Sequence, residues 1–184
     1  MRNGPADGRI SPVPKRVFTA HHLGFGATRE ALRNLVPRPL AWVTTTGGDG
    51  QPHLAAQSFV TLVSADPPMV GVTVFGEQQS LANIERTHEF VVSFATRDTV
   101  EQAEAVLGEI DPDVAEFGAG LELEPSDSVD VQRPSDSPVH LECQLHAVLN
   151  FGNGHLVIGR LTAFLVDDDL SRGKASSPLA VIGI

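Results

Sequence analysis

Small polar side chains at the ends of predicted strands, and at the start of one predicted helix, are the residues best suited to bind a ligand. Three threonines at 44–46 run into a glycine-rich turn, and Gln57-Ser58 interrupts an otherwise apolar stretch. Ser80 opens a segment with helical spacing that also contains Asn83. A hydroxyl beside backbone N–H groups at a helix N-terminus attracts anions such as phosphate. A purely structural role remains open, since threonine favours strands and Ser80 could simply cap its helix.

Other chemistries have less support. The chain has seven histidines, but no HExxH motif, cysteine pair or carboxylate cluster accompanies them, so we expect no metal site. Cys143 lies in an apolar segment and is expected to be a buried small hydrophobe rather than a nucleophile. The run Gly152-Asn153-Gly154 lacks the rest of a GxGxxG motif and lies between predicted strands, which argues against a dinucleotide fold.

Hydrophobic patterning predicts the elements that position these residues. Helices are expected at 28–35, 79–87 and 99–107. Strands are expected at 40–46, 51–64 (bulged near Ala55-Ala56), 69–75, 89–95, 139–151 and 155–166. Asn153-Gly154 is a strong hairpin signal between the last two strands, and residues 108–137 are expected to be irregular.

These elements predict a mainly β fold. The strands follow one another in hairpins, which implies antiparallel pairing, and strands of this length would leave exposed edges in a flat sheet. A closed or nearly closed antiparallel β-barrel with helical insertions solves both problems, while an open α+β sheet is the alternative. We expect residues 1–20 to form a flexible N-terminal arm and residues 21–184 to form one domain.

Net charge and composition exclude some classes of binding partner. The 184 residues carry a formal net charge of −10, which argues against binding to nucleic acid or anionic membranes, because phosphate neutralisation needs Lys and Arg. The acidity is concentrated in residues 98–142, where Arg133 is the single basic residue. No apolar run approaches the roughly 18 residues that a membrane helix needs, and no secretory signal is evident. With one cysteine, a cytoplasmic location is expected.

Several segments, taken in order, resemble the flavin reductase-like domain family, the FMN-binding split barrels. The matching segments are 38–45 (RPLAWVTT), 49–59 (DGQPHLAAQSF), 64–70 (SADPPMV), 80–84 (SLANI), 89–92 (EFVV), 137–143 (SPVHLEC) and 155–159 (HLVIG). Each segment is weakly diagnostic alone, whereas their common order over residues 28–183 is specific.

The resemblance implies a homodimer of antiparallel split barrels that bind FMN or FAD and use NADH or NADPH as co-substrate. It further implies a flavin reductase that supplies reduced flavin to a partner monooxygenase. The cofactor-binding residues that it implies are Arg38, Pro39, Trp42, Thr44, Thr45, Thr46, Ala56, Gln57, Ser58, Phe59, Ser80 and Asn83. His155 matches the histidine that such enzymes place near the nicotinamide, and is the implied catalytic residue.

The chain departs from the family pattern in three places. Gln78-Gln79-Ser80 stands where many relatives have Lys-Asp-Thr, so neutral donors replace a cation at the phosphate site. His53 replaces an expected asparagine, and Val181 replaces an arginine near a C-terminus that also lacks the family's terminal aromatic residue. These changes keep two alternatives open, a flavin-binding electron carrier and a split-barrel binding module that lacks flavin.

Overall fold

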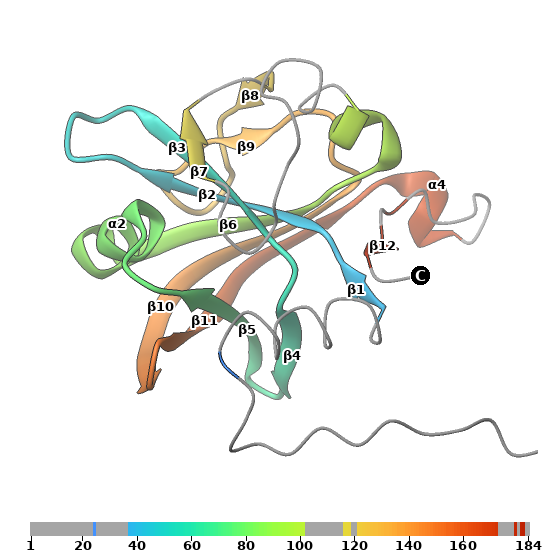
Figure 1. Ribbon diagram of the computed structural model, residues 1–184. Coiled ribbons are helices and arrows are strands. Elements are labelled where there is room, and N and C mark those ends of the chain that lie inside the picture. Colours follow the sequence, from blue (N-terminus) through green and yellow to red (C-terminus); the bar gives the residue numbers. More distant parts are fainter. Residues whose placement is uncertain are drawn as a thin grey trace, which may run out of the picture.

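The computed structural model describes residues 24, 37–101, 116–118, 121–172, 179 and 181–182, with the backbone alone described at 116–118 and 181–182 (Figure 1). The expected N-terminal arm and the expected helix at 28–35 lie outside the described residues. A helix is expected at 99–107. The structure has helical residues at 97–101, and residues 102–107 lie outside the described residues.

One antiparallel sheet of eight strands dominates the molecule, in the order β4-β5-β11-β10-β6-β2-β3-β7 (Figure 1). Its strands are β2 (Ala41–Thr46), β3 (Pro52–Gln57), β4 (Val60–Ala65), β5 (Pro68–Phe75), β6 (Glu89–Phe94), β7 (Glu116–Gly118), β10 (Val139–Phe151) and β11 (Gly154–Val166). Two short ladders accompany it, β1 (Arg38–Pro39) with β12 (Val181–Ile182), and β8 (Leu123–Glu124) with β9 (Arg133–Pro134). The helices are α2 (Gln79–Thr87) and α4 (Asp168–Ser171).

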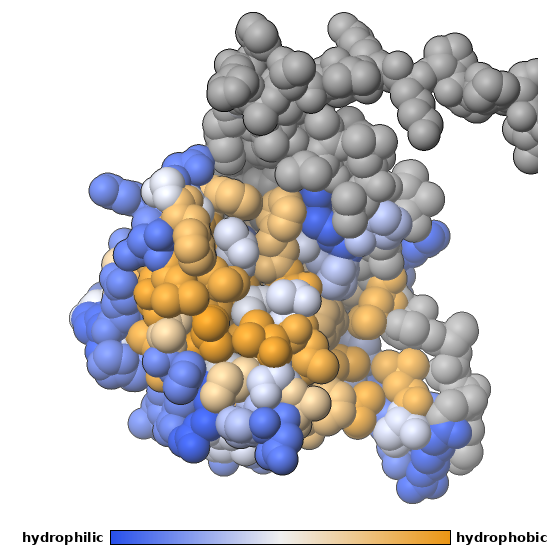
Figure 2. All heavy atoms as spheres, turned by 90° about the horizontal axis from the view of Figure 1, so that it is seen from below, coloured by the Kyte–Doolittle hydropathy of each residue, from blue (hydrophilic) through white to orange (hydrophobic). Residues whose placement is uncertain are grey.

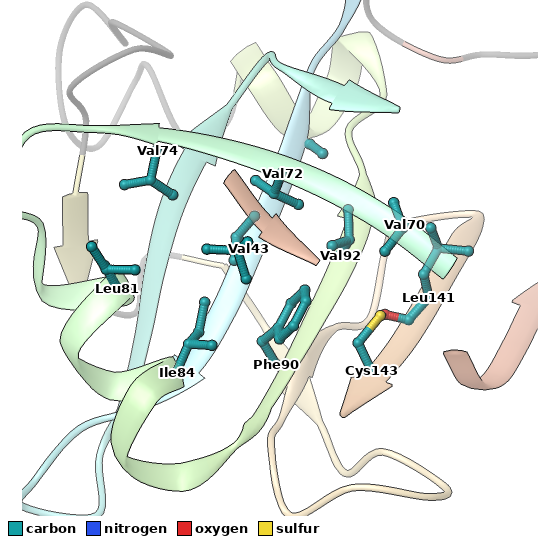
Figure 3. Close-up of a cluster of buried hydrophobic side chains, with 12 residues drawn as sticks. Val43, Val70, Val72, Val74, Leu81, Ile84, Phe90, Val92, Leu141 and Cys143 are labelled. Atoms are coloured by element: carbon teal, nitrogen blue, oxygen red, sulfur yellow. The ribbon is translucent and has the colours of Figure 1, made fainter. Parts of the chain in front are cut away.

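The sheet curls around a main apolar core. Val43 of β2, Val72 of β5 and Phe90 of β6 belong to the same buried cluster, although β5 and β2 are far apart in the sheet order (Figure 3). Ile84 of α2 packs into the same cluster and covers one end of it (Figure 3). A Cβ atom at Gly159 would lie 2.4 Å from the ring of Phe90, so only glycine lets that ring pack against β11.

The expected antiparallel, mainly β fold is confirmed, but one strand was predicted wrongly. The stretch 51–64 is two strands rather than one strand with a bulge at Ala55-Ala56. The chain leaves the sheet at Ser58-Phe59, and β4 then pairs with β5 instead of continuing β3. Hydrophobic patterning missed the break because both halves are equally rich in strand-forming residues.

Smaller differences concern turns and short elements. The β10–β11 turn is centred on Gly152-Asn153, because Gly154 already pairs with Phe151 as the first residue of β11. The predicted glycine turn at 47–50, the strand that precedes it and α2 are confirmed. The short elements β1, β7, β8, β9, α4 and β12 were not predicted, and β7, β8 and β9 lie in the stretch 108–137 that was expected to be irregular.

Candidate functional site

A pocket of about 350 Å³ lies where β1 meets the break between β3 and β4. Arg38 is 5% exposed at its wall, and its Nε atom donates a hydrogen bond to Ser58 Oγ at 3.1 Å. The guanidinium carbon lies 4.4 Å above the centre of the Phe59 ring, in a cation–π contact. The pocket therefore has a fixed positive charge set in apolar surroundings. Its lining residues are Pro37, Arg38, Pro39, Ser58, Phe59, Val60, Thr61 and Thr73.

The break at Ser58-Phe59 shapes this pocket. The Phe59 carbonyl accepts a hydrogen bond from the Thr73 N–H at 2.9 Å, which anchors the break to β5. The Phe59 ring also meets Phe75 edge-on, with centroids 5.3 Å apart. A continuous strand would send Ser58 and Phe59 to opposite faces of the sheet, whereas here both line the same pocket.

The start of α2 forms a second part of the site. Gln78 is the N-cap in an extended conformation, and its side chain does not cap the helix. Its amide instead donates to the Phe75 carbonyl at 3.2 Å and accepts from Gln57 Nε2 at 3.0 Å. The first turn has no acidic residue, so the positive end of the helix dipole is not neutralised there. This helix start can hold a phosphate through backbone N–H groups.

Asn83 and Thr45 tie α2 to the sheet beneath that helix start. Asn83 Nδ2 donates to Thr45 Oγ1 at 3.0 Å, and Asn83 Oδ1 accepts from Gln79 Nε2 at 2.9 Å. Asn83, Thr45 and Ser80 are all buried. In this structure Asn83 and Thr45 therefore position the helix from below.

The three threonines are separated by the strand pleat. Thr45 contacts α2, whereas Thr44 points to the opposite face, where its buried Oγ1 makes no hydrogen bond with a described residue. Thr46 donates to the Asp130 carbonyl at 3.2 Å. Trp42 and Ala56 are packed in a separate core cluster with Leu40 and Ala95. The structure thus brings Arg38, Pro39, Ser58 and Phe59 to the pocket, with Gln57 beside it, but not Thr44, Trp42 or Ala56.

His155 lies at the start of β11, opposite Val74 of β5. Paired residues project to the same face, so His155 shares the face of Val74, and the pocket residue Thr73 projects to the other. The His155 Nδ1 atom lies 2.6 Å from Asn150 Oδ1. If Nδ1 carries the proton, this contact leaves Nε2 as an acceptor.

A buried charge cluster lies on β10, outside the pocket lining. Glu142 is fully buried and accepts hydrogen bonds from the N–H groups of Asp127 and Ser128, the Ser128 hydroxyl and Arg133 Nη1, at 2.6–2.9 Å. Burial alone would raise the pKa of Glu142, but these bonds hold it below its usual value. Burial, and next the charge of Arg133, lowers the pKa of His140.

The expectation that Cys143 is buried is confirmed. Its thiol is fully enclosed, and burial raises its pKa to about 12, so it is not a thiolate at neutral pH.

Sequence reasoning missed several pocket residues. Val60, Thr61 and Thr73 line the pocket, and Gln78 links it to the helix start. Strand alternation carried part of the signal, since Thr73 lies between the core residues Val72 and Val74 and must face away from them. The contact of Gln78 with Gln57 joins residues far apart in the chain, and no local pattern predicts it.

Comparison with known proteins identifies the family. Residues 32–181 match the flavin reductase like domain, so the chain belongs to this family, as the segment order predicted. The uncharacterised protein YwrF of Bacillus subtilis is 31% identical over 165 residues, which cover 83% of this chain and 80% of that protein.

Solved structures share the fold. Nitrilotriacetate monooxygenase component B from Bacillus cereus superimposes with a TM-score of 0.76 at 20% identity, covering 94% of this chain and 98% of the other. The NADH:FAD oxidoreductase SgcE6 of Streptomyces globisporus gives 0.68 at 18% identity, covering 84% and 89%. At these identities the likeness shows the split-barrel fold.

The residues present suit a flavin phosphate. The pocket offers a cation, a hydroxyl and aromatic and aliphatic walls, and the nearby helix start offers backbone donors for a phosphate.

No helix in the described part of the chain is long and apolar enough to cross a membrane.

Proposed function

We propose that this protein is an NAD(P)H-dependent flavin reductase that supplies reduced flavin to a partner monooxygenase. The observation that carries the proposal is the pocket in which a buried Arg38 lies over Phe59 and bonds Ser58, in a chain of the flavin reductase-like family. A bound flavin would supply the ring that accepts hydride from the nicotinamide.

The chain's own contribution is electrostatic and positional. Arg38 places a permanent positive charge at the pocket wall, where partial exclusion of water strengthens its attraction for negative charge. Reduction of the flavin ring adds electron density, so this charge favours the reduced ligand. Phe59, fixed by its edge contact with Phe75, offers a rigid apolar wall beside the ring.

The phosphate end of the site supports exchange of flavin rather than permanent retention. Gln78, Gln79 and Ser80 offer neutral donors, and the segment 76–84 contains no Lys or Arg. Without a cationic contact the phosphate is held by hydrogen bonds and the helix dipole, which are weaker than a charge pair. Loose binding suits a flavin that leaves once it is reduced.

We further propose that the protein is a homodimer. A groove of about 380 Å³ with almost entirely apolar walls lies beside the flavin pocket, and Val60 and Thr61 line both. Leu62 and Phe164, at the groove, are 69% and 61% exposed, and Figure 2 shows a broad apolar area on the face seen from below. Apolar surface of this kind marks protein contacts, and a second copy on it would border the flavin pocket.

Anaerobic visible spectroscopy tests the proposed activity. FMN and FAD are added in turn to the purified protein at tens of micromolar, followed by NADH and NADPH. Loss of flavin absorbance, with steady turnover when air is admitted, is the expected result. Flavin binding without bleaching would overturn the reductase and favour the electron carrier. No binding of either flavin would overturn both and leave the flavin-less binding module.

A further inference from the structure

We propose that a second cavity, at the β2–β3 turn, binds the adenosine half of FAD, so that FAD rather than FMN is the preferred flavin; this inference rests on the proposed function. The cavity has a volume of about 370 Å³, within the range of about 300–1,000 Å³ typical of small-molecule sites. Polar and apolar groups share its lining, in contrast to the apolar groove. Its lining residues are Gly47, Gly48, Asp49, Gln51, Pro52, His53 and Gln79.

The cavity continues the flavin site past the helix start. Gln79, the first residue of α2, lines it, and the preceding Gln78 bonds Gln57 beside the flavin pocket. A phosphate held at the start of α2 would therefore lie between the two cavities. A dinucleotide with its ring at Arg38 and its diphosphate at the helix start would reach the turn with its adenosine.

The distance along β3 agrees with a dinucleotide that runs from the flavin pocket, past the start of α2, to the second cavity. Ser58 lines the flavin pocket and His53 lines the second cavity, five residues earlier in the chain. At about 3.3 Å per residue, their Cα atoms lie roughly 17 Å apart. FMN ends at its single phosphate and would stop at the helix, whereas FAD continues through a second phosphate, a ribose and adenine.

Asp49 supplies the chemistry that recognises a ribose. Its Oδ1 atom accepts the Gln51 N–H at 3.0 Å, which fixes the carboxylate over the turn, while no described residue bonds its Oδ2. A Cβ atom at Gly47 would lie 2.6 Å from Asp49 Oδ1, so glycine permits this placement. Carboxylates at dinucleotide sites accept hydrogen bonds from ribose hydroxyls.

His53 adds a second polar group to the wall. Its Nδ1 atom is buried and makes no hydrogen bond with a described residue. Buried polar atoms in native proteins are usually paired, so the wall holds a group that lacks its partner. The turn side of the cavity thus offers an anionic acceptor and an imidazole, and the helix side offers backbone donors for phosphate.

Separate dissociation constants for FAD and FMN test the inference. Asp49→Ala should raise the Kd of FAD roughly tenfold or more, the loss of one charged hydrogen bond, and leave the Kd of FMN unchanged. Asp49→Asn can keep the bond from Gln51 but replaces the second acceptor with a donor, so it should weaken FAD to a similar extent. Asp136→Ala, at an exposed aspartate in another turn, is the matched control and should change neither.

Three outcomes would overturn the assignment. Equal losses of affinity for FAD and FMN would mean that Asp49 supports the structure of the site and does not contact the adenosine. An unchanged Kd of FAD in both Asp49 variants would remove the cavity from the site. A raised KM for NADH in the Asp49 variants, measured with FMN as acceptor, would mean that the cavity binds the nicotinamide dinucleotide instead of FAD. The proposed function is tested separately. The Asp49→Ala variant should still reduce FMN, and a selective loss of FAD affinity is measured by binding alone, without turnover.

Discussion

Arg38 combines three properties that seldom occur together at a surface. It is almost fully buried, it contacts an aromatic face, and its Nε atom donates a hydrogen bond to a serine hydroxyl. A buried guanidinium favours a ligand that brings negative charge. We therefore expect the pocket to select its ligand by charge as well as by shape.

Arg38→Gln should shift the redox balance of bound flavin. Without the cation, affinity for reduced flavin should fall roughly tenfold more than affinity for oxidised flavin, equivalent to about 1.4 kcal/mol. The reduction potential of the bound flavin would become more negative, which dye-coupled anaerobic titration measures. Arg160→Gln, at an exposed arginine of β11, is the control. A reduction potential that Arg38→Gln leaves unchanged would show that Arg38 does not lie beside the flavin ring.

His155 has a different position and calls for a different measurement. It lies on the face of Val74, held by Asn150, and does not line the pocket at Arg38. If it orients the nicotinamide, His155→Ala should lower the NAD(P)H-dependent rate about tenfold, within the range for lost orientation, with little change in flavin Kd. Stopped-flow reduction at saturating flavin separates the two quantities. His146→Ala, at an exposed histidine of β10, should have no effect. A larger loss in flavin affinity than in rate would contradict the role.

At the scale of elements, the described part of the acidic segment is not a loose loop. Residues 121–137 contain β8 and β9, and Glu142 of β10 holds the backbone of residues 127 and 128 through its carboxylate. Arg133 joins Glu142, Asp127 and Glu124 in one ion-pair network. The buried carboxylate of Glu142 thus helps to attach this segment to the barrel, together with the contacts of Asp130 to Thr46 and Glu89.

Glu142→Gln should destabilise the fold in a pH-dependent way. At pH 7 we expect a loss of about 3 kcal/mol, because Arg133 and two backbone donors lose a charged partner. The pKa of Glu142 is lowered in the folded protein, so its stabilisation is complete above the unfolded pKa near 4.3 and disappears as pH falls through the folded pKa. Urea unfolding at pH 7 and at lower pH should therefore show the variant approaching wild type in acid. Glu122→Gln, at an exposed site, is the control, and a pH-independent loss would contradict the argument.

At the scale of the whole molecule, the apolar groove and the proposed flavin pocket are neighbours. Their shared residues Val60 and Thr61 lie at the start of β4, an edge strand of the sheet. Unpaired edges and exposed apolar surfaces promote association. Dimerisation through the groove would cover that surface and place a second subunit beside the flavin.

Phe164→Asp should convert the proposed dimer to a monomer. A carboxylate in the groove opposes burial of the surface, and dissociation should raise the dimer Kd at least a hundredfold, or about 2.7 kcal/mol. Sedimentation velocity over a concentration series measures the change. Phe151→Asp, at a similarly exposed phenylalanine near the β10–β11 turn, is the matched control and should stay dimeric. A monomeric wild type, or dissociation by the control alone, would contradict the proposed interface.

Local patterns were sufficient for most of the long elements of the fold. The long hairpin of β10 and β11, the β2–β3 turn and α2 follow from side-chain periodicity and turn residues, which act over a few neighbouring positions. The order of the family segments was likewise readable along the chain, and the matched domain confirmed it. The burial of Cys143 followed from its apolar strand.

The sequence by itself determined most of the long strands, the antiparallel class and the family. Tertiary structure decided where the chain leaves the sheet at Ser58, which threonine faces α2, and that Arg38 lies over Phe59. It also decided that Glu142 holds a distant acidic segment. The physical reason is separation along the chain: each of these contacts joins residues on different elements, so its partner is chosen by packing of the whole barrel and not by neighbouring residues.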